Sequence, residues 1–352
     1  MRISGIDHVE FYVADADLAT ARLRAEYGMR VHGVTTAADH RSVLLRQGDI
    51  RLLVTEGSTD DHPAAAFVAA HGDGPATIAL ATDDPDAALT EAVAAGAVPM
   101  ATSLDGPLDS APPASQVRIT AFGDVAHTFV RPGALDADLG SVPEPDAGAL
   151  DLLDLLDHVA VCVPGGELGP TVRFYQDVLG FGLIFQEYIE VGDQAMNSQV
   201  VQSPSGGVTL TLLEPDTSRT PGQIDDFLRA HDGAGVQHLA LRTDDIATGV
   251  RTLGERGVGF LTTPGSYYDE LERRLGHVGL PVATLRDLNI LVDQDNEGEL
   301  FQIFAQSTHP RRTFFFEIIE RRHALTFGSA NIKALYEAVE RERASHGAGV
   351  SR

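Results

Sequence analysis

Residues 79–84 read ALATDD and residues 240–245 read ALRTDD, so the two stretches differ at a single position. Gly96 and Gly257 then match at the same offset of 161 residues, which extends the ungapped correspondence over 18 residues. Upstream of each stretch, IDHV at residues 6–9 corresponds to LDHV at residues 156–159. Correspondence of this length and order is hard to produce by chance, so we infer an internal duplication.

Each half of the duplication is built from a further repeated pattern of one strand, one amphipathic helix and several strands. In one copy, Pro170 suits a first helical turn and Gly180 suits a helix end. Between them, Val172, Tyr175 and Leu179 form an apolar stripe at helical spacing. The pattern predicts an α+β fold of four βαβββ units, with two units in each half.

The chain has 352 residues, which allows about two domains at roughly 150 residues each. Between Arg131 and Asp154 it is rich in Pro, Gly, Asp and Ala and has no strand or helix periodicity until its end. We therefore predict an N-terminal structural domain at residues 1–135, a linker at residues 136–153 and a C-terminal catalytic domain at residues 154–352.

The composition excludes several classes of function. The net charge of −25 repels phosphate backbones and anionic membrane surfaces, so we expect neither nucleic acid nor membrane as a partner. The single cysteine, Cys162, rules out an intrachain disulfide and a thiolate metal cluster, so any metal must be held by His and carboxylates. The chain has no apolar run of about 18 residues and no secretory signal, which predicts a cytoplasmic protein. Motifs for nucleotide binding and serine hydrolysis are absent.

Two histidines and one glutamate form the candidate metal site. His158 lies in the first strand of the third unit and His238 in the first strand of the fourth, so equivalent positions of paired units converge. Glu317 interrupts the very apolar strand TFFFEII, where a buried carboxylate needs a reason. A structural ion pair of Glu317 with Arg321 or Arg322 is the alternative. Two histidines and one carboxylate are the ligand set of oxygen-activating Fe(II) sites.

The N-terminal half is an internal control for this hypothesis. The offset of 161 residues places Thr77 at the counterpart of His238, so this half has lost one ligand. His8 and Glu10 superficially offer a His-x-carboxylate pair, but the counterpart of Glu10 is Ala160. We predict that the N-terminal domain is a scaffold or a dimer surface without a metal site.

These motifs resemble the 4-hydroxyphenylpyruvate dioxygenase family, which has the vicinal oxygen chelate fold. The resemblance covers nearly the whole chain. It is strongest in LDHVAV (156–161), AMNSQVV (195–201), GQIDDFL (222–228), GAGVQHLAL (233–241), TTPGSYYDEL (262–271), ILVDQDNEGELFQIF (290–304), TFFFEIIERR (313–322) and FGSANIKALYEAVE (327–340).

The resemblance implies two open-barrel domains, an Fe(II) cofactor, 4-hydroxyphenylpyruvate and O₂ as substrates, and a homodimer. It carries His158, His238 and Glu317 over as the iron ligands. The positions that it matches to the substrate pocket are Ser198, Gln223, Gln237, Gln302, Phe304, Phe315, Phe327 and Asn331. Thr211, which departs from the family pattern, is a further candidate with Ser198 and Asn331 for holding the polar ends of the substrate. Gln302 and Phe304 are two apart on one strand and so share a face. Ordinary packing in the hydrophobic core explains the three phenylalanines as well as contact with the substrate does.

The terminal segment NIKALYEAVERER, at residues 331–343, places Ile332, Leu335, Tyr336 and Val339 on one helical face. Most helices of this kind are only structural. Because the family segment begins after Phe327, we expect a C-terminal lid helix that closes over the iron and excludes water.

Two departures from the family pattern concern the product. Homogentisate-forming members typically read Pro-x-Asn before Glu-Pro, whereas this chain reads TLLEP at residues 211–215. They have Phe after the Asn of the terminal segment, whereas this chain has Ile332. With ADHRS at residues 38–42 and VTLTLLEP at residues 208–215, the chain resembles the branch that forms 4-hydroxymandelate for 4-hydroxyphenylglycine in peptide antibiotics. Leu213 and Ile332 are the predicted specificity residues.

Three alternatives remain open. The same scaffold can form homogentisate, which only product analysis separates from 4-hydroxymandelate. Extradiol cleavage of catechols uses a similar ligand set but needs no α-keto acid. A silent module of the same fold would bind a ligand without consuming O₂.

Overall fold

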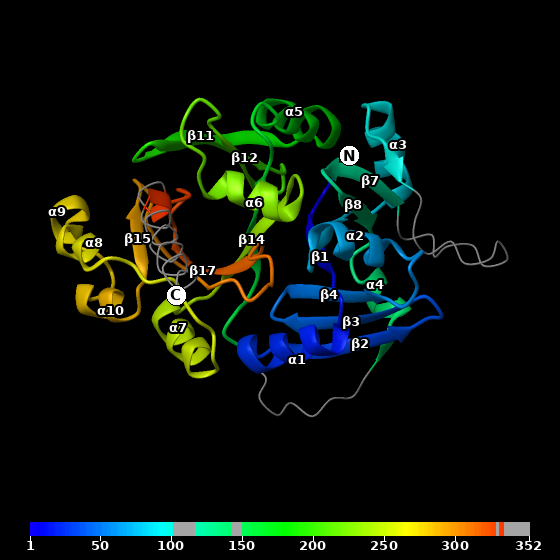
Figure 1. The fold of residues 1–352 in the computed structure, drawn as a ribbon, viewed down its shortest axis with the longest axis horizontal. Helices are drawn as coiled ribbons and strands as arrows, with labels where there is room; N and C mark the ends of the chain where they lie inside the picture. Colours follow the sequence, from blue (N-terminus) through cyan, green and yellow to red (C-terminus); the bar gives the residue numbers. More distant parts are fainter. Residues whose placement is uncertain (101–116, 142–149, 329–330, 334–352) are drawn as a thin grey trace, which may run out of the picture.

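The computed structural model describes residues 1–100, 117–141, 150–328 and 331–333. Their strands form two sheets, a nine-stranded sheet in the N-terminal half and an eight-stranded sheet in the C-terminal half. Figure 1 shows the two halves side by side, blue to cyan and green to orange, with each sheet curled into an open barrel. The predicted α+β fold with two open-barrel domains is confirmed.

The N-terminal half contains the first two units. The first is β1 (Gly5–Tyr12), α1 (Ala16–Tyr27), β2 (Arg30–Thr36), β3 (His40–Gln47) and β4 (Ile50–Gly57). After α2 (Pro63–His71), the second is β5 (Gly74–Ala81), α3 (Pro85–Ala94), β6 (Pro99–Met100), β7 (Val117–Phe122) and β8 (Val125–Val130). Two short elements follow, α4 (Ala134–Asp138) and β9 (Gly140–Ser141).

The C-terminal half repeats this order. The third unit is β10 (Leu156–Cys162), α5 (Leu168–Leu179), β11 (Gly182–Val191), β12 (Gln194–Gln202) and β13 (Thr209–Pro215). After α6 (Gln223–His231), the fourth unit begins with β14 (Gly235–Arg242) and α7 (Ile246–Glu255). It continues with α8 (Gly265–Asp269), α9 (Leu271–Leu275), α10 (Val282–Asp287), β15 (Leu291–Gln294), β16 (Glu299–Phe304) and β17 (Phe315–Arg322).

The centre of each sheet has the same four-strand arrangement. The opening strands of the two units lie side by side and antiparallel, β1 with β5 and β10 with β14. Each opening strand is also parallel to the last strand of its own unit, so the C-terminal order is β13-β10-β14-β17. The two units of a half are therefore related by an approximate twofold, which brings their equivalent residues together.

The repeated TDD motif has a local physical role. Asp84 accepts a hydrogen bond from the Ala87 amide at 3.1 Å, and Asp245 accepts one from the Thr248 amide at 3.0 Å. Both aspartates are thus N-caps, which typically stabilise a helix by about 1 kcal/mol. Gly257, the matched glycine after the second helix, has a φ of 101°, a conformation that favours glycine. The motif that reveals the duplication therefore encodes a strand end followed by a helix start.

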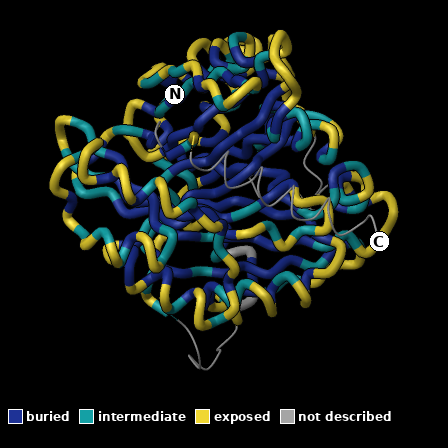
Figure 2. Tube along the Cα trace, turned by 60° about the vertical axis from the view of Figure 1, so that its left-hand side comes forward, coloured by how far each residue is buried: buried dark blue, intermediate teal, exposed yellow. Residues whose placement is uncertain are grey.

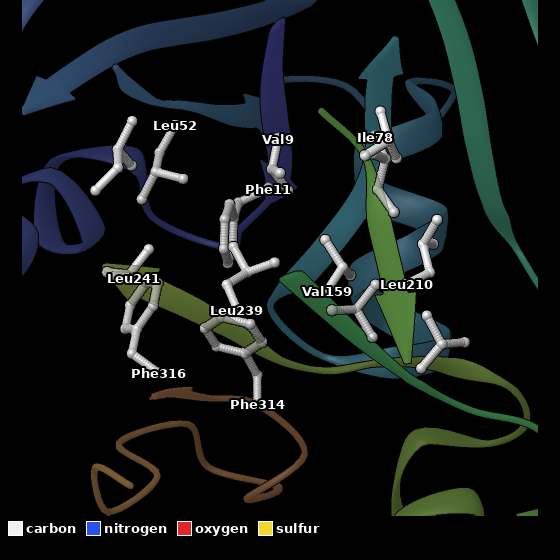
Figure 3. Packing of buried hydrophobic residues seen from close by; sticks show 14 of the residues in the cluster. Val9, Phe11, Leu52, Ile78, Val159, Leu210, Leu239, Leu241, Phe314 and Phe316 are labelled. Atoms are coloured by element: carbon white, nitrogen blue, oxygen red, sulfur yellow. The ribbon is translucent and has the colours of Figure 1, made fainter. Parts of the chain in front are cut away.

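The two halves share one hydrophobic core. Phe11 meets Phe314 edge to face at 5.1 Å between ring centroids, and Tyr27 meets Phe316 at 4.8 Å. Figure 3 shows Phe11 of the N-terminal half facing the side chains from the C-terminal half, and Figure 2 shows the buried strands running through the centre. Across the same interface, the buried Tyr175 hydroxyl donates to His127 Nε2 at 2.9 Å.

The segment predicted to be a linker, residues 136–153, is only partly irregular. It includes most of α4 and all of β9, which pairs with β2 through Gly33 and Ser141. A two-residue strand is too short to show a periodicity, and its pairing is set by the free edge of β2. This part of the expected linker belongs to the N-terminal sheet, while residues 142–149 lie outside the described residues.

The predicted terminal helix is described only at its start. Residues 331–333 are helical, and the amide of Ile332 bonds to the carbonyl oxygen of Gly328 at 2.9 Å. Leu335, Tyr336 and Val339 lie outside the described residues, so the lid stays a prediction. No helix among the described residues is long and apolar enough to cross a membrane.

We predict that His127 makes the stability of the chain sensitive to mild acid. Burial lowers the pKa of His127 from 6.5 to about 4. As the pH falls from 6.5 to 4, His127 becomes protonated in the unfolded chain but stays neutral in the folded chain. The free energy of unfolding therefore falls over this range. Below pH 4 this loss reaches ~3 kcal/mol.

Urea unfolding of His127→Gln at a series of pH values should therefore show a shallower pH slope in this window. His231, whose pKa burial and His71 also lower to about 4, leaves a residual slope. His277→Gln, at an exposed position, is the matched control and should keep the wild-type slope. An unchanged slope in His127→Gln would contradict the assignment.

Candidate metal centre

Three adjacent central strands present the predicted ligands to one point. His158 on β10 lies opposite Ala240 on β14, and Ala240 lies opposite Glu317 on β17. His238 is two residues before Ala240 on the middle strand, so its side chain lies on the same face. The three side chains are buried, with exposed fractions of 4%, 7% and 1% for His158, His238 and Glu317.

A register irregularity accompanies each histidine. Between Leu156 and His158 strand β10 has one more residue than its partner, and between Val236 and His238 strand β14 has one more. Such β-bulges re-aim side chains locally. Asp157 and Gln237 are the extra residues. A side-chain oxygen of Asp157 lies 2.9 Å from Nδ1 of His158, and the side-chain oxygen of Gln237 lies 3.4 Å from Nδ1 of His238.

These contacts decide which nitrogen is free. Because Nδ1–H of His158 donates to the Asp157 carboxylate, Nε2 is the nitrogen that faces the centre. Nε2 of His158 lies 3.3 Å from Oε2 of Glu317, and Nε2 of His238 lies 3.2 Å from the same oxygen. Two nitrogen lone pairs and an anionic oxygen repel each other at these distances unless a cation lies among them.

The charges of the three side chains favour a bound cation. Burial alone would lower the pKa of His158, but the carboxylates of Glu317 and Asp157 outweigh it and raise this pKa to about 9. Burial would likewise raise the pKa of Glu317, but the two imidazoles hold it at about 2. Burial lowers the pKa of His238. A proton on His158 balances the charge when no metal is bound, and a metal ion would take its place.

The donor set suits a divalent transition metal. One ligand atom from each of the three residues lies within 4.8 Å of the other two. Neutral imidazole and carboxylate, without thiolate, are ligands for iron, and two histidines with one carboxylate leave further coordination positions open. His158, His238 and Glu317 would hold the ion.

Glu317 is held from its other oxygen by a chain of hydrogen bonds. Gln302 donates to Oε1 of Glu317 at 2.7 Å, and Asn331 donates to Gln302 at 2.9 Å. The Tyr267 hydroxyl donates to Asn331 at 2.8 Å and accepts from the Val292 amide at 2.8 Å. This chain leaves Oε2 of Glu317 as the oxygen that faces the histidines.

Aromatic rings surround the ligands. Phe315 stacks on the His238 ring with centroids 5.0 Å apart, and Phe304 meets it at 6.1 Å. Phe327 meets the His158 ring edge to face at 5.9 Å. These rings reduce the dielectric around the centre, which strengthens electrostatic interactions inside it.

Two family models match the chain. Residues 1–124 match "Hydroxyphenylpyruvate dioxygenase, HPPD, N-terminal", and residues 155–273 match the Glyoxalase/Bleomycin resistance protein/Dioxygenase superfamily. The 4-hydroxyphenylpyruvate dioxygenase of Dictyostelium discoideum is 32% identical, with 98% of this chain and 100% of that protein covered. A probable 4-hydroxyphenylpyruvate dioxygenase 2 of Aspergillus fumigatus is 31% identical, with 97% and 94% covered. The chain belongs to the 4-hydroxyphenylpyruvate dioxygenase family.

Solved structures agree with this family assignment. A triple mutant of 4-hydroxymandelate synthase from Streptomyces coelicolor superposes with a TM-score of 0.84 at 44% identity, covering 97% of this chain and 100% of that one. A xylose isomerase-like TIM barrel/4-hydroxyphenylpyruvate dioxygenase fusion protein gives a TM-score of 0.76 at 26% identity, covering 96% of this chain and 52% of that one.

The predicted specificity residues of this dioxygenase-family chain lie in one cluster. Leu213 is buried with Met196 and Cys162, and Ile332 packs against the same cluster. Leu213 also pairs across the sheet with Ser198, which is buried. The structure thus brings together positions more than a hundred residues apart in the sequence.

The remaining predicted polar pocket residues fall into three groups. The buried hydroxyl of Thr211 has no hydrogen-bond partner among the described residues. Gln223 and Gln237 line a cavity of about 250 Å³ together with Phe315. Gln302 and Asn331 are engaged with Glu317 and with each other. The substrate contacts of all these residues stay predictions.

The N-terminal barrel of this family member has a different group at the equivalent place. His8 lies opposite Ala79 and Ala79 opposite Thr128, so Thr128 takes the position of Glu317. Arg118 donates to Thr128 at 3.2 Å and to Glu10 at 2.8 Å. This buried guanidinium supplies positive charge beside Glu10 and Thr128, and the scaffold role of the N-terminal domain stays a prediction.

A second group in the N-terminal half, Asp39, His40 and His62, also gathers metal-ligating atoms within 4.8 Å, and the sequence reasoning did not single it out. His62 is less suited to bind a metal. Its Nδ1 accepts the Ala64 amide at the start of α2 at 3.1 Å, which leaves the proton on Nε2. The positive end of the helix dipole also disfavours a cation there.

The supporting roles of Asp157, Arg321 and Tyr267 were not predicted from the sequence, where Arg321 is named only as a possible ion-pair partner of Glu317. Arg321 donates to both oxygens of Asp157, at 2.7 Å and 2.9 Å. One signal was available, because the pair Asp-His occurs at both 7–8 and 157–158, and in both places the aspartate bonds to Nδ1. Nothing in the sequence pattern around Tyr267 points to its contact with Asn331.

We predict that the chain binds one divalent metal ion, in the C-terminal barrel. Glu317→Gln removes the anionic ligand, so its affinity for Fe(II) should fall by more than the ~10–100-fold typical of losing an outer partner. His8→Gln, in the N-terminal barrel, is the matched control and should retain one ion per chain. Anaerobic titration with metal analysis measures both. Two ions per wild-type chain, or loss of the ion in His8→Gln, would contradict the assignment.

Proposed function

We propose that the chain is an Fe(II)-dependent dioxygenase that converts 4-hydroxyphenylpyruvate and O₂ to 4-hydroxymandelate and CO₂. The observation that carries the proposal is the convergence of His158, His238 and Glu317. Leu213 and Ile332 share one hydrophobic cluster, and Ile332 directly follows Asn331, which bonds to the Gln302 that holds Glu317. The likeness to a 4-hydroxymandelate synthase mutant at 44% identity supports this product. One oxygen atom of O₂ would enter the benzylic alcohol and the other the new carboxylate, while the original carboxylate leaves as CO₂.

The ferrous ion would supply a chelation site for the α-keto acid and the electrons that activate O₂. The chain's own residues would orient the reactants. Asp157 and Gln302 fix the ligand side chains, so the orientation of the metal-facing atoms is set before the substrate arrives. Phe304 and Phe315 would wall the site and exclude water from it.

Polar groups of the pocket would hold the two ends of the substrate. Thr211 has a buried hydroxyl without a partner among the described residues, and an unpaired buried hydroxyl costs about 1–3 kcal/mol. A substrate oxygen that bonds to it would recover this free energy. We assign Thr211, with Ser198 on the neighbouring strand, to contacts with the substrate rather than with the metal.

The choice of product would depend on where the aromatic ring rests. Hydroxylation of the benzylic carbon gives 4-hydroxymandelate, whereas attack on the ring carbon that bears the side chain gives homogentisate. A difference of about 1.4 kcal/mol between the two barriers changes the product ratio tenfold. We infer that Leu213 and Ile332 leave room for the ring to turn so that the benzylic carbon faces the metal.

Homogentisate formation is the second candidate, because the curated relatives at 31–32% identity bear the name 4-hydroxyphenylpyruvate dioxygenase. The two products have the same elemental formula and consume the same O₂. Oxygen uptake therefore tests the reaction class, and chromatography of the product tests the branch.

The experiment that tests the proposal starts from anaerobic loading with Fe(II). Addition of 4-hydroxyphenylpyruvate and O₂ should give equal amounts of consumed O₂, released CO₂ and 4-hydroxymandelate. A catechol without an α-keto acid should give no turnover, which separates extradiol cleavage. Absence of O₂ uptake with every substrate would leave only the silent binding module.

We predict that Ile332→Phe, alone and combined with Leu213→Asn, shifts the product toward homogentisate. The aromatic ring would narrow the space beside Leu213 and push the substrate ring toward the metal. The matched control, Ile332→Leu, keeps an aliphatic side chain and should still give 4-hydroxymandelate. Chromatography of the products measures the ratio, and unchanged pure 4-hydroxymandelate in both variants would contradict the specificity hypothesis.

We also propose the setting of the reaction. The product is a precursor of 4-hydroxyphenylglycine, so we place the chain in peptide-antibiotic biosynthesis. A cytoplasmic location is supported by the single, buried Cys162, since a reducing compartment needs no disulfides. A homodimer follows from the family resemblance alone.

A further inference from the structure

Arg321, near the end of β17, has a guanidinium group that contacts two separate parts of the site. On one side it donates from Nε and Nη2 to the two oxygens of Asp157. On the other side Nη1 donates to the carbonyl oxygen of Thr326 at 2.7 Å and to that of Ala324 at 3.3 Å. The guanidinium also lies over the Phe327 ring, 5.0 Å from its centroid.

The first of these parts is the support of an expected iron ligand. Asp157 bonds to Nδ1 of His158 and thereby fixes the nitrogen that faces the centre. A paired, planar guanidinium fork fixes a carboxylate in orientation as well as in charge. Arg321 therefore determines the position of Asp157, and through it the orientation of the His158 ring.

The second part is the segment at residues 324–328, which leads from β17 to the terminal segment. Apart from Arg321, it is held by Asp295, which accepts the amides of Leu325 and Thr326 at 2.6 Å and 2.7 Å. Its Phe327 ring contacts the His158 ring and the Phe185 ring, each at 5.9 Å. Together with Arg321 and Asp157, it lines a cavity of about 810 Å³.

A similar connection follows the segment, where the amide of Asn331 donates to the carbonyl oxygen of Gly328 at 2.8 Å. Asn331 bonds to Gln302, which bonds to Glu317. The segment is thus linked to the supports of two of the three expected ligands, at Arg321 before it and at Asn331 after it. Because these links are directional hydrogen bonds, a displacement of the segment changes the orientation of the ligand supports.

We propose that Arg321 is a positioning residue that couples the seating of residues 324–328 to the orientation of His158. This proposal rests on the proposed function only because it takes His158 to be a metal ligand. When the segment is seated, the guanidinium fork holds Asp157 and the His158 ring is aligned for the metal. When Arg321 is lost, the segment and the ligand support become independent of each other.

Arg322 provides a matched control on the same strand. It donates to Glu320 at 2.6 Å and lies over the Phe301 ring at 4.8 Å, so it also combines an ion pair with a ring contact. It has no described bond to Asp157 or to residues 324–328. A purely structural role for Arg321 would make the two arginines equivalent in their effects on the metal site.

The experiment uses the full chain with Co(II) or Fe(II) alone as the probe, under anaerobic conditions for Fe(II). In the wild type we expect metal binding to slow hydrogen exchange of the peptide that covers residues 324–328. In Arg321→Met, metal affinity should fall by about 10–100-fold. Exchange of the peptide should then no longer respond to metal. Arg322→Met should keep wild-type affinity and the exchange response.

Two further variants keep the proposal testable if Arg321→Met folds poorly. Arg321→Lys retains the charge without the fork and should lose part of the exchange response. Asp157→Asn breaks the same link from the other end, so its effect on metal affinity should be non-additive with that of Arg321→Lys. Wild-type metal affinity with an intact exchange response in both Arg321 variants would overturn the proposal. Neither readout uses substrate, so a different product would contradict the proposed function and leave this test unaffected.

Discussion

The central feature of the C-terminal barrel is a buried carboxylate that faces two imidazole nitrogens and has no other ion-pair partner among the described residues. Glu317 is 1% exposed, and one of its oxygens lies 3.2–3.3 Å from Nε2 of both His158 and His238. Burial of such a group is costly unless a cation is present, so the site has to hold either a proton or a metal. Neighbouring residues hold the side chains in this arrangement, because Asp157 orients His158 and Gln302 orients the Glu317 carboxylate.

The two barrels supply positive charge to their buried carboxylates in different ways. Both halves place the opening strands of their units side by side, so equivalent residues meet at the centre of each barrel. In the C-terminal barrel two histidines and a carboxylate converge there, and an ion from solution would be needed. In the N-terminal barrel Arg118 brings the positive charge on the chain itself and pairs with Glu10 at 2.8 Å. The fold is therefore common to both halves, and the two barrels differ in the side chains at these central positions.

Much of the fold followed from the sequence because repeated motifs have local causes. The TDD stretches mark strand ends and helix caps, and the equivalence of His158 and His238 followed from their places in paired units. The α4 and β9 elements did not follow, because such short elements have no periodicity and their formation depends on the edge of β2. The β-bulges that turn Asp157 and Gln237 toward the ligands were also inaccessible, since register depends on the partner strand. Arg321 entered only as a possible ion-pair partner of Glu317, whereas its contacts are with Asp157 and residues 324–327.

The central claim is that one iron ion binds where these three side chains meet. Anomalous diffraction at the iron absorption edge, from crystals of the iron-loaded chain, tests it most directly. The account predicts a single strong peak per chain, within bonding distance of Nε2 of His158, Nε2 of His238 and the Glu317 carboxylate. A peak beside His8 or His62, or ligand side chains that point away from a common centre, would contradict it.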